Sequence, residues 1–205
     1  MRQGRLFVLS GPSGTGKGTI CKALMKEGDP QLALSISMTT RAPRGIEIPD
    51  VSYYYVSAEE FQRTADADGF LEHASIYGNR YGTPKEPVLR KLREGIDVIL
   101  EIEMQGAMQV KQAYPDARLI FVLPPSLEVL RNRLISRGTE DEDQLRRRMC
   151  AAMEEIRKIE DYEYFVVNGD LASAVDAVRA IIRSGRQEVD EACCEAIIRK
   201  YEEEE

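Results

Sequence analysis

Residues 11–19 read GPSGTGKGT, and this spacing is typical of a loop that wraps phosphate groups. The pattern follows a short apolar run, Leu6–Ser10, and precedes a run of helical character, Thr19–Glu27. Glycines let successive backbone N–H groups point inward at an anion, and the amino end of the next helix adds a positive dipole. Lys17 supplies a mobile charge for β- and γ-phosphates. The predicted phosphate-binding residues are Gly11, Pro12, Ser13, Gly14, Thr15, Gly16, Lys17, Gly18 and Thr19.

One residue of this loop departs from the general motif. The residue after the lysine is usually Ser or Thr, whose hydroxyl helps to hold Mg²⁺, but here it is Gly18. A hydroxyl–metal contact is therefore not expected at that position, while Thr19 remains within reach of an α- or β-phosphate. The alternative interpretation of residues 11–19 is a glycine-rich turn without a ligand, and the lysine and the strand–helix context argue against it.

A second candidate group ends the apolar run Val98–Ile102. Ligands of parallel sheets bind beyond the carboxyl ends of the strands, so Glu103 is a candidate to hold Mg²⁺ directly or through a water. A plain surface carboxylate is the alternative.

Seven arginines fall within residues 126–158. Arg133 and Arg137 are four residues apart and share a helix face, and Arg148 follows in the run Arg146–Arg148. Arginines that face inward on a closing lid would bring positive charge to a transferred phosphoryl group. The alternative is a solvated basic face balanced by the acidic run 140–143.

A further anion site is predicted in residues 37–47. Arg41 and Arg44 are three residues apart beside hydroxyl-bearing residues, which suits a monophosphate, and Tyr53 and Tyr81 are candidates to add phenolic donors. Two more carboxylates, Glu72 and Glu101, are candidates to read a base, because a carboxylate accepts two parallel N–H bonds and the guanine edge offers such a pair. The single histidine, His73, is assigned no role.

The elements that must position these groups alternate along the chain. Buried strands are expected at Leu6–Ser10, Val98–Ile102, Leu119–Leu123 and Tyr164–Val167, with helical patterns between them. Helix starts are expected at four caps, Ser57, Thr83, Ser126 and Thr139, and the helix after Thr83 should end near Gly95. The alternation predicts an α/β fold with a parallel sheet flanked by helices. Residues 36–82 are expected to form an inserted β-rich lobe and residues 126–158 a helical lid, which leaves 1–35, 83–125 and 159–205 as the core.

Composition excludes several classes of protein. The chain has 205 residues, 43% of them hydrophobic, and a net charge of −7, which disfavours binding to a nucleic-acid polymer. No apolar run approaches the roughly 18 residues that cross a bilayer, and the start of the chain leaves no room for a signal peptide. The four cysteines, at positions 21, 150, 193 and 194, show no metal-ligand spacing, so a reduced cytoplasmic setting is expected. Either a monomer or a small homo-oligomer fits.

The motifs taken together resemble the guanylate kinase family, and the resemblance runs from Gly4 to about Ile182. It is carried by GPSGTGKGT (11–19), SMTTRAPRGIE (37–47), FLEHASIYGNRYGT (70–83), VILEIEMQGA (98–107), FVLPPS (121–126), RLISRGTEDE (133–142) and VVNGDL (166–171). The resemblance implies a P-loop kinase fold with a GMP-binding lobe and a lid. It implies transfer of the γ-phosphoryl group of ATP to GMP, and plausibly to dGMP, with Mg²⁺.

The resemblance also implies roles for single residues. The GMP phosphate would be held by Arg41, Arg44, Tyr53 and Tyr81; guanine would be read by Ser37, Glu72, Thr83 and Glu101. Arg133, Arg137 and Arg148 would act in transfer, Asn168 would lie near the adenine of ATP, and Glu47 would order the arginine loop. Four residues depart from the common pattern: Gly18 for Ser, Arg80 for Tyr, and Glu101 and Glu103 for Asp.

Two rival functions remain open from the sequence. One is a non-catalytic module of the same fold that binds phosphorylated partners, which would show little ATP binding. The other is a P-loop kinase for a different small phosphate substrate, against which Glu72 and the Ser37 region argue.

Overall fold

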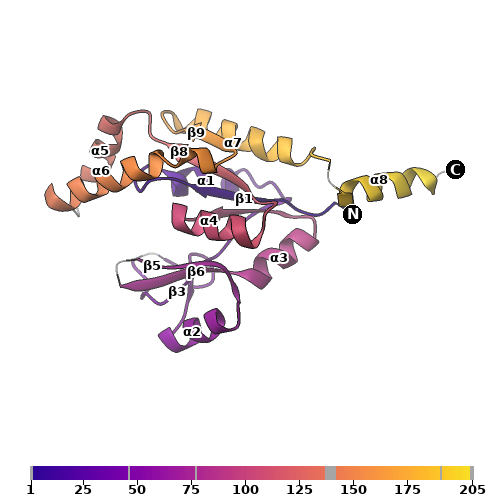
Figure 1. Cartoon of the computed structure of the whole chain (residues 1–205), viewed down its shortest axis with the longest axis horizontal. Helices are drawn as coiled ribbons and strands as arrows, with labels where there is room; N and C mark the ends of the chain where they lie inside the picture. The colour runs from indigo at the N-terminus through magenta and orange to yellow at the C-terminus, as the bar shows by residue number, and fades with distance from the viewer. Residues whose placement is uncertain (1, 46, 77, 137–141, 190, 204–205) are drawn as a thin grey trace.

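Two β-sheets organise the chain in the computed structural model, which describes residues 2–45, 47–76, 78–136, 142–189 and 191–203 (Figure 1). The larger sheet is wholly parallel, with the strand order β2-β7-β1-β8-β9. Its strands are β1 (Leu6–Ser10), β2 (Leu32–Leu34), β7 (Asp97–Glu101), β8 (Arg118–Leu123) and β9 (Tyr164–Val167). The predicted α/β class and the four expected strands are confirmed, and β2 is an additional edge strand that the sequence analysis missed.

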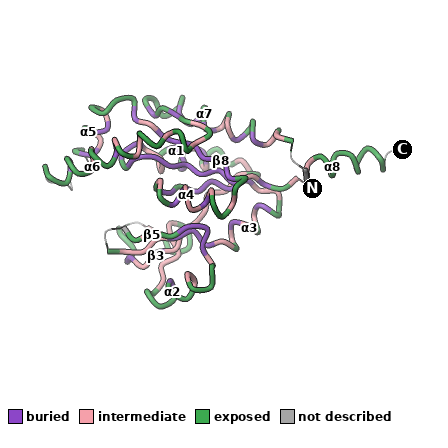
Figure 2. The backbone as a smooth tube through the Cα atoms, in the orientation of Figure 1, coloured by how far each residue is buried: buried purple, intermediate pink, exposed green. Residues whose placement is uncertain are grey.

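Alternate residues of the central strand β1 belong to two apolar clusters on opposite faces of this sheet. Phe7 and Leu9 pack with α1 (Lys17–Lys26) and α7 (Leu171–Gly185). Leu6 and Val8 pack with α3 (Lys85–Arg93) and α4 (Met104–Ala113). All five residues of β1 are buried, and the buried tube in Figure 2 follows the sheet through the middle of the molecule. The hydrophobic effect on both faces thus fixes the strand that leads into the phosphate loop.

The smaller sheet has the order β4-β3-β6-β5 and lies below the larger one in Figure 1, with α2 (Ala58–Asp66) at its far side. Its strands are β3 (Met38–Thr39), β4 (Tyr54–Tyr55), β5 (Phe70–Ile76) and β6 (Asn79–Pro84). The strands β5 and β6 pair antiparallel, and β5 lies against α4. This sheet occupies the stretch that the sequence predicted as an inserted β-rich lobe.

Two helices at one end of the larger sheet carry five of the seven arginines of the predicted lid. They are α5 (Leu127–Ile135) and α6 (Glu142–Ile156), and they share a small apolar cluster of Leu130, Leu134, Leu145 and Ala152. A short 3-10 turn, Ile159–Asp161, leads from α6 toward β9. Arg137 and the predicted cap Thr139 lie outside the described residues.

The predicted helix caps had mixed outcomes. Ser57 accepts a 3.1 Å hydrogen bond from the backbone N–H of Glu60, and Ser126 accepts one of 3.1 Å from Val129, so both caps are confirmed. The expectation that Thr83 caps a helix is wrong. Thr83 lies within β6, the helix starts after Pro84, and the Thr83 hydroxyl bonds to a carboxylate of the neighbouring strand instead. That helix ends as expected before Gly95, whose φ of 80° suits a glycine.

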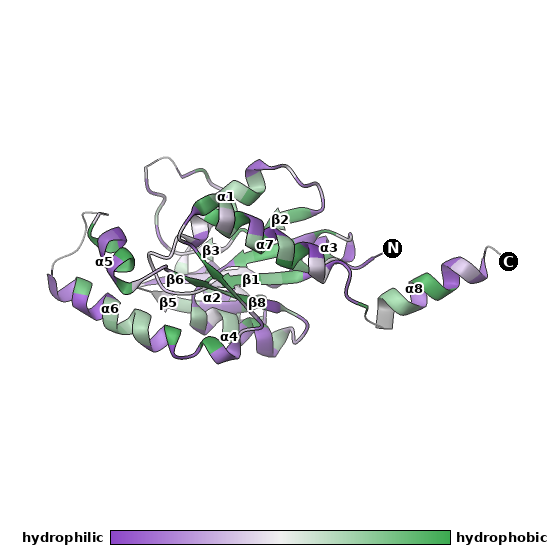
Figure 3. Ribbon diagram, turned by 90° about the horizontal axis from the view of Figure 1, so that it is seen from above, coloured by the Kyte–Doolittle hydropathy of each residue, from purple (hydrophilic) through white to green (hydrophobic). Residues whose placement is uncertain are grey.

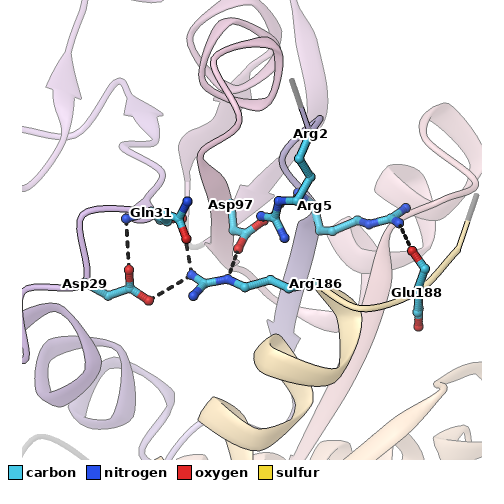
Figure 4. A network of polar contacts seen from close by, with 7 residues as sticks. All are labelled: Arg2, Arg5, Asp29, Gln31, Asp97, Arg186 and Glu188. Atoms are coloured by element: carbon cyan, nitrogen blue, oxygen red, sulfur yellow. Dashed lines mark hydrogen bonds and ion pairs between the residues drawn. The ribbon is translucent and has the colours of Figure 1, made fainter. Parts of the chain in front are cut away.

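A network of charged residues holds the amino ends of the parallel strands. We call it the amino-end cluster: Arg2, Arg5, Asp29, Asp97, Arg186 and Glu188, which takes part through its backbone carbonyl oxygen (Figure 4). At its centre, the fully buried Asp97 accepts hydrogen bonds from the backbone N–H of Arg5 at 2.8 Å and from Nε of Arg186 at 2.6 Å. Arg2 forms a further ion pair with Asp97. The cluster joins the chain start, β7 and the end of α7, at the edge of the sheet opposite the phosphate loop.

The last helix, α8 (Glu191–Glu202), extends away from the two sheets in both Figure 1 and Figure 3. Within the described residues, no helix combines the length and the hydropathy needed to cross a membrane.

Candidate active site

The phosphate loop follows directly from β1, and its glycines have the backbone angles that the motif requires. The φ angles of Gly11, Gly14 and Gly16 are 135°, 92° and 91°. Residues that carry a side chain rarely adopt such backbone angles. Gly16 is also the N-cap of α1. The ammonium group of Lys17 folds back over the loop and donates to the carbonyl oxygens of Gly11 and Pro12. The loop is therefore preformed, with its cation beside the space where phosphates would lie.

Two residues distant in sequence hold this loop from behind. The amide Nδ2 of Asn168, which follows β9, donates a 2.7 Å hydrogen bond to the Thr15 carbonyl oxygen. Arg133 on α5 donates to the carbonyl oxygens of Asn168 at 2.8 Å and Thr15 at 3.4 Å. Thr15 itself is buried and bonds back to Pro12 at 2.9 Å. In this conformation, Asn168 and Arg133 brace the loop backbone.

A cavity of about 850 Å³ opens between the phosphate loop and the smaller sheet. It brings together most of the residues that the sequence singled out. From the predicted set it is lined by Ser13, Gly14, Gly16, Lys17, Gly18, Thr19, Ser37, Arg41, Arg44, Tyr53, Glu72, Tyr81, Glu101 and Glu103. The predicted residues that are not part of this lining are Gly11, Pro12, Thr15, Thr83, Arg133, Arg148 and Asn168, and Arg137 lies outside the described residues. The two predicted anion sites thus line the same open cavity from opposite walls.

The arginine wall of the cavity is organised by Glu47. Its carboxylate accepts two hydrogen bonds of 2.8 Å from the guanidinium group of Arg41 and a third, also 2.8 Å, from the backbone N–H of Arg44. The Tyr55 hydroxyl, which the sequence analysis did not single out, donates a fourth at 2.8 Å. The paired guanidinium of Arg41, with the other donors, lowers the pKa of Glu47 to about 2. The contact expected for Glu47 with the arginine loop is present.

Aromatic residues complete this wall. Nε of Arg41 donates a 3.1 Å hydrogen bond to the Tyr81 hydroxyl oxygen, and the Arg41 guanidinium lies 5.1 Å from the centre of the Tyr53 ring. Arg80, one of the departures from the family pattern, points elsewhere. It bonds to Gln62 at 2.7 Å and stacks over Phe61, so it leaves the cavity wall unchanged.

Glu72 lies at the deep end of the cavity and is only 6% exposed. Its Oε1 accepts a 2.7 Å hydrogen bond from the Thr83 hydroxyl. On its other side stands Gly106 of α4, where an added Cβ atom would lie 2.7 Å from Oε2. Burial raises the pKa of Glu72, the hydrogen bonds from Thr83 oppose the rise, and the charge of Glu103 adds to it. The result is a fixed, buried acceptor.

The other two carboxylates, Glu101 and Glu103, both line the cavity but have different neighbours. Glu101, predicted to read a base, lies against Gly18 of the phosphate loop, where an added Cβ would be 3.0 Å from Oε1. Glu103, predicted to hold metal, is the N-cap of α4, and its negative charge helps to raise the pKa of Glu72. Enclosure by the cavity walls raises the pKa of Glu101, although solvent still reaches its side chain, and Lys17 and Lys22 oppose that rise.

One further carboxylate approaches the same region from α6. Partial burial raises the pKa of Glu155, the charge of Lys17 opposes this, and the charge of Glu103 adds to it. Nothing in the local sequence separated Glu155 from the other acidic residues of that helix, because its relation to Lys17 arises only from the folding of α6 over the loop.

The donor set suits a metal ion carried by a nucleotide. Among the described residues, no group of three or more His, Cys, Asp or Glu side chains is arranged to hold a metal ion. Mg²⁺ commonly takes one or two carboxylates together with substrate phosphates and waters, and Glu101 beside the phosphate loop is such a carboxylate.

Comparisons with known proteins agree with this geometry. A family model described as guanylate kinase matches residues 3–185. The chain is 48% identical over 204 residues to a guanylate kinase of Clostridioides difficile, covering 100% of this chain and 98% of that protein. It is 51% identical over 189 residues to one of Caldanaerobacter subterraneus, covering 92% and 91%. A crystal structure of guanylate kinase from Anaplasma phagocytophilum superposes with a TM-score of 0.75 at 31% identity, covering 92% of this chain and 89% of that one.

Proposed function

This chain belongs to the guanylate kinase family of nucleoside monophosphate kinases, and we propose that it transfers the γ-phosphoryl group of ATP to GMP, giving ADP and GDP. The observation that carries the proposal is the shared cavity. A phosphate loop with its lysine faces an arginine pair across the same 850 Å³ volume, and a buried carboxylate closes one end. Two anion sites and one base-reading acceptor are what a kinase for a nucleoside monophosphate needs. We propose dGMP as a second acceptor.

The ATP phosphates bind in the loop 11–19, where backbone N–H groups and Lys17 neutralise their charge. We assign Asn168 to this side of the site. Its amide fixes the Thr15 carbonyl, so it shapes the loop in addition to the predicted contact near adenine.

The GMP phosphate binds to Arg41, Arg44, Tyr53 and Tyr81. Glu47 holds the Arg41 guanidinium by two hydrogen bonds, which leaves less rotamer entropy to lose when phosphate binds. The base then extends toward Glu72, with Ser37 and Thr83 beside it. The Glu72 carboxylate accepts the N1–H and N2–H bonds of guanine; adenine lacks this donor pair. We propose that Glu103 lies at this end of the cavity and takes the base-reading role first predicted for Glu101.

We propose that Mg²⁺ bound with ATP is held on the protein side by Glu101, directly or through water, in place of Glu103. Mg²⁺ supplies charge neutralisation for the β- and γ-phosphates. The protein contributes the remaining positive charge through Lys17 and the arginines of residues 126–158, with Arg133, Arg137 and Arg148 as the predicted transfer residues. Transfer runs directly between the two substrates, without a covalent enzyme intermediate.

Closure of the two lobes over the core would exclude water, so that transfer outruns hydrolysis. We retain the predicted division into a core (1–35, 83–125 and 159–205), a GMP-binding lobe (36–82) and a lid (126–158). The proposed setting is the cytoplasm, with the chain acting as a monomer or small homo-oligomer and without nucleic-acid or membrane partners. The net charge of −7 and the lack of metal-ligand spacing among the four cysteines support this setting.

The test is an assay of ADP release with Mg-ATP and one acceptor at a time: GMP, dGMP, AMP, CMP or UMP. We expect rapid turnover with GMP and little with AMP. Turnover with a different acceptor would keep the kinase but overturn the role of Glu72. A folded protein that turns over no acceptor would favour the non-catalytic binding module.

A further inference from the structure

Gly18 is a glycine that the backbone does not require. The glycines of the phosphate loop at 11, 14 and 16 all have positive φ angles, whereas Gly18 is not among the positive-φ residues and lies in the first turn of α1. A glycine in a regular helix costs about 1 kcal/mol relative to alanine. The reason for glycine at this position must therefore be the space that a side chain would fill.

That space is taken by a side chain from another element. A Cβ atom built on Gly18 would lie 3.0 Å from Oε1 and 3.3 Å from Oε2 of Glu101, closer than Cβ atoms normally approach a neighbour. Glu101 ends β7, and β7 pairs directly with β1, the strand that leads into the loop. Its carboxylate thus extends from β7 to the first turn of α1 and lies against the backbone of Gly18.

The chemistry of the pair is also complementary. At this position the general motif carries a hydroxyl that serves the nucleotide-bound cation, and Gly18 has none. Glu101 brings a carboxylate oxygen, which is also a ligand for Mg²⁺, to within van der Waals reach of the missing side chain. Partial burial raises the pKa of this carboxylate, and the positive charges of Lys17 and Lys22 oppose the rise.

We propose that Gly18 and Glu101 are a matched pair, in which the missing side chain lets the longer carboxylate lie where the motif's hydroxyl would stand and take over its positioning task. Glu101 is then the residue that orients the cation side of the phosphate loop, and Gly18 is the residue that permits it. The inference deepens the proposed function, because it rests on a nucleotide phosphate site at residues 11–19. It implies that a hydroxyl at 18 and a shorter acid at 101 form the equivalent alternative pair.

The experiment is a double-mutant cycle with Gly18→Ser, Glu101→Asp and the double variant. The readout is the affinity for Mn²⁺, followed by its paramagnetic resonance signal, in the presence of the β,γ-methylene analogue of ATP. We expect each single variant to weaken Mn²⁺ binding about tenfold, and the double variant to return to within about threefold of the parent. Gly18→Ser alone crowds the carboxylate, whereas Glu101→Asp alone leaves both oxygens short of the site.

Gly18→Ala is the matched control, since it fills the space without supplying a hydroxyl. Combined with Glu101→Asp, it should remain about tenfold weaker than the serine double variant. Losses that simply multiply in the Gly18→Ser/Glu101→Asp variant would overturn the pairing, as would a Gly18→Ser variant that binds Mn²⁺ like the parent. Thermal unfolding of each variant checks that it is folded. Because the readout is cation binding, the pairing can fail while GMP turnover is intact, and absence of GMP turnover would not alter this result.

Discussion

The Thr83 hydroxyl donates a 2.7 Å hydrogen bond to Oε1 of Glu72; both side chains are buried, and Glu72 lies at the deep end of the cavity. The bond joins adjacent antiparallel strands and fixes one oxygen of the carboxylate, so that its direction is set before any ligand arrives. A preset acceptor of this kind discriminates strongly, because a ligand without matching donors leaves it unpaired.

Glu72→Gln should therefore damage acceptor use far more than ATP binding. The amide would turn an N–H₂ group toward a donor, and we expect kcat/KM for GMP to fall by about 100-fold, as for other lost buried hydrogen-bond pairs. Steady-state kinetics with GMP varied, beside binding of an ATP analogue, provide the measurement. Equal losses for both nucleotides would remove Glu72 from base recognition.

Gly106→Ala tests the packing behind the same carboxylate. In most helices this change stabilises the fold by about 1 kcal/mol, but here the added Cβ would lie 2.7 Å from Oε2 of Glu72. We expect KM for GMP to rise about tenfold, because the added methyl group would displace the Glu72 carboxylate from its position. Gly169→Ala is the matched control, because its Cβ would meet Pro125 at an ordinary 3.6 Å. An unchanged KM for Gly106→Ala would show that Glu72 has room to move.

Glu47→Gln should remove a pH-dependent contribution to stability. The pKa of Glu47 is lowered from 4.5 to about 2 in the fold, so its contribution is fully present above pH 4.5 and is lost as the pH falls toward 2. We expect the melting temperature of the parent to exceed that of the variant at pH 7, and the gap to narrow across this window. Melting curves at a series of pH values measure it. A constant gap would mean that the charge is not what stabilises the arginine loop.

Asn168→Asp exchanges the donor that holds the phosphate loop for an acceptor. The carboxylate would face the Thr15 carbonyl oxygen across the present 2.7 Å contact, and the two would repel each other. We expect KM for ATP to rise about tenfold, since a buried acceptor loses its partner, while KM for GMP changes little. Asn168→Ala should show the smaller effect of the two, since it removes the bond without adding charge. A larger rise in the GMP value would contradict the bracing role.

Asp97→Asn should lower stability without changing the chemistry. The fully buried carboxylate is paired with Arg2 and Arg186, and breaking such a pair costs about 3 kcal/mol. Urea unfolding followed by circular dichroism gives the free energy, and kcat at 25 °C serves as the control that should stay near the parent value. A variant as stable as the parent would show that the arginines are sufficiently solvated without Asp97.

The sequence predicted the parts of this site whose geometry is local. The loop 11–19 needs only its own glycines, a strand before it and a helix after it, and all are present. Thr83 was misassigned because the Thr-Pro-x-Glu pattern is a local cap signal, whereas its real partner, Glu72, comes from the neighbouring strand. The edge strand β2 was missed because its apolar run, Leu32–Leu34, is only three residues long and only partly buried.

Glu101 and Glu103 illustrate a second limit. Two residues apart on a continuing strand they would share one face, but β7 ends at Glu101 and Glu103 already begins α4. The turn between them sends one carboxylate to the phosphate loop and the other toward Glu72. A sequence pattern predicts the end of a strand only to within one or two residues, and here that difference decides which neighbours each carboxylate has.

The amino-end cluster lies at the opposite edge of the sheet from the cavity, with no residue common to both linings. The residues of the amino-end cluster, which stabilise the fold, are therefore different from the residues that line the cavity. Selection for growth at another temperature can act on Arg2, Asp97 or Arg186 and leave turnover intact, and an engineer can do the same. In this fold, residues that set thermal stability can therefore change independently of residues that line the cavity.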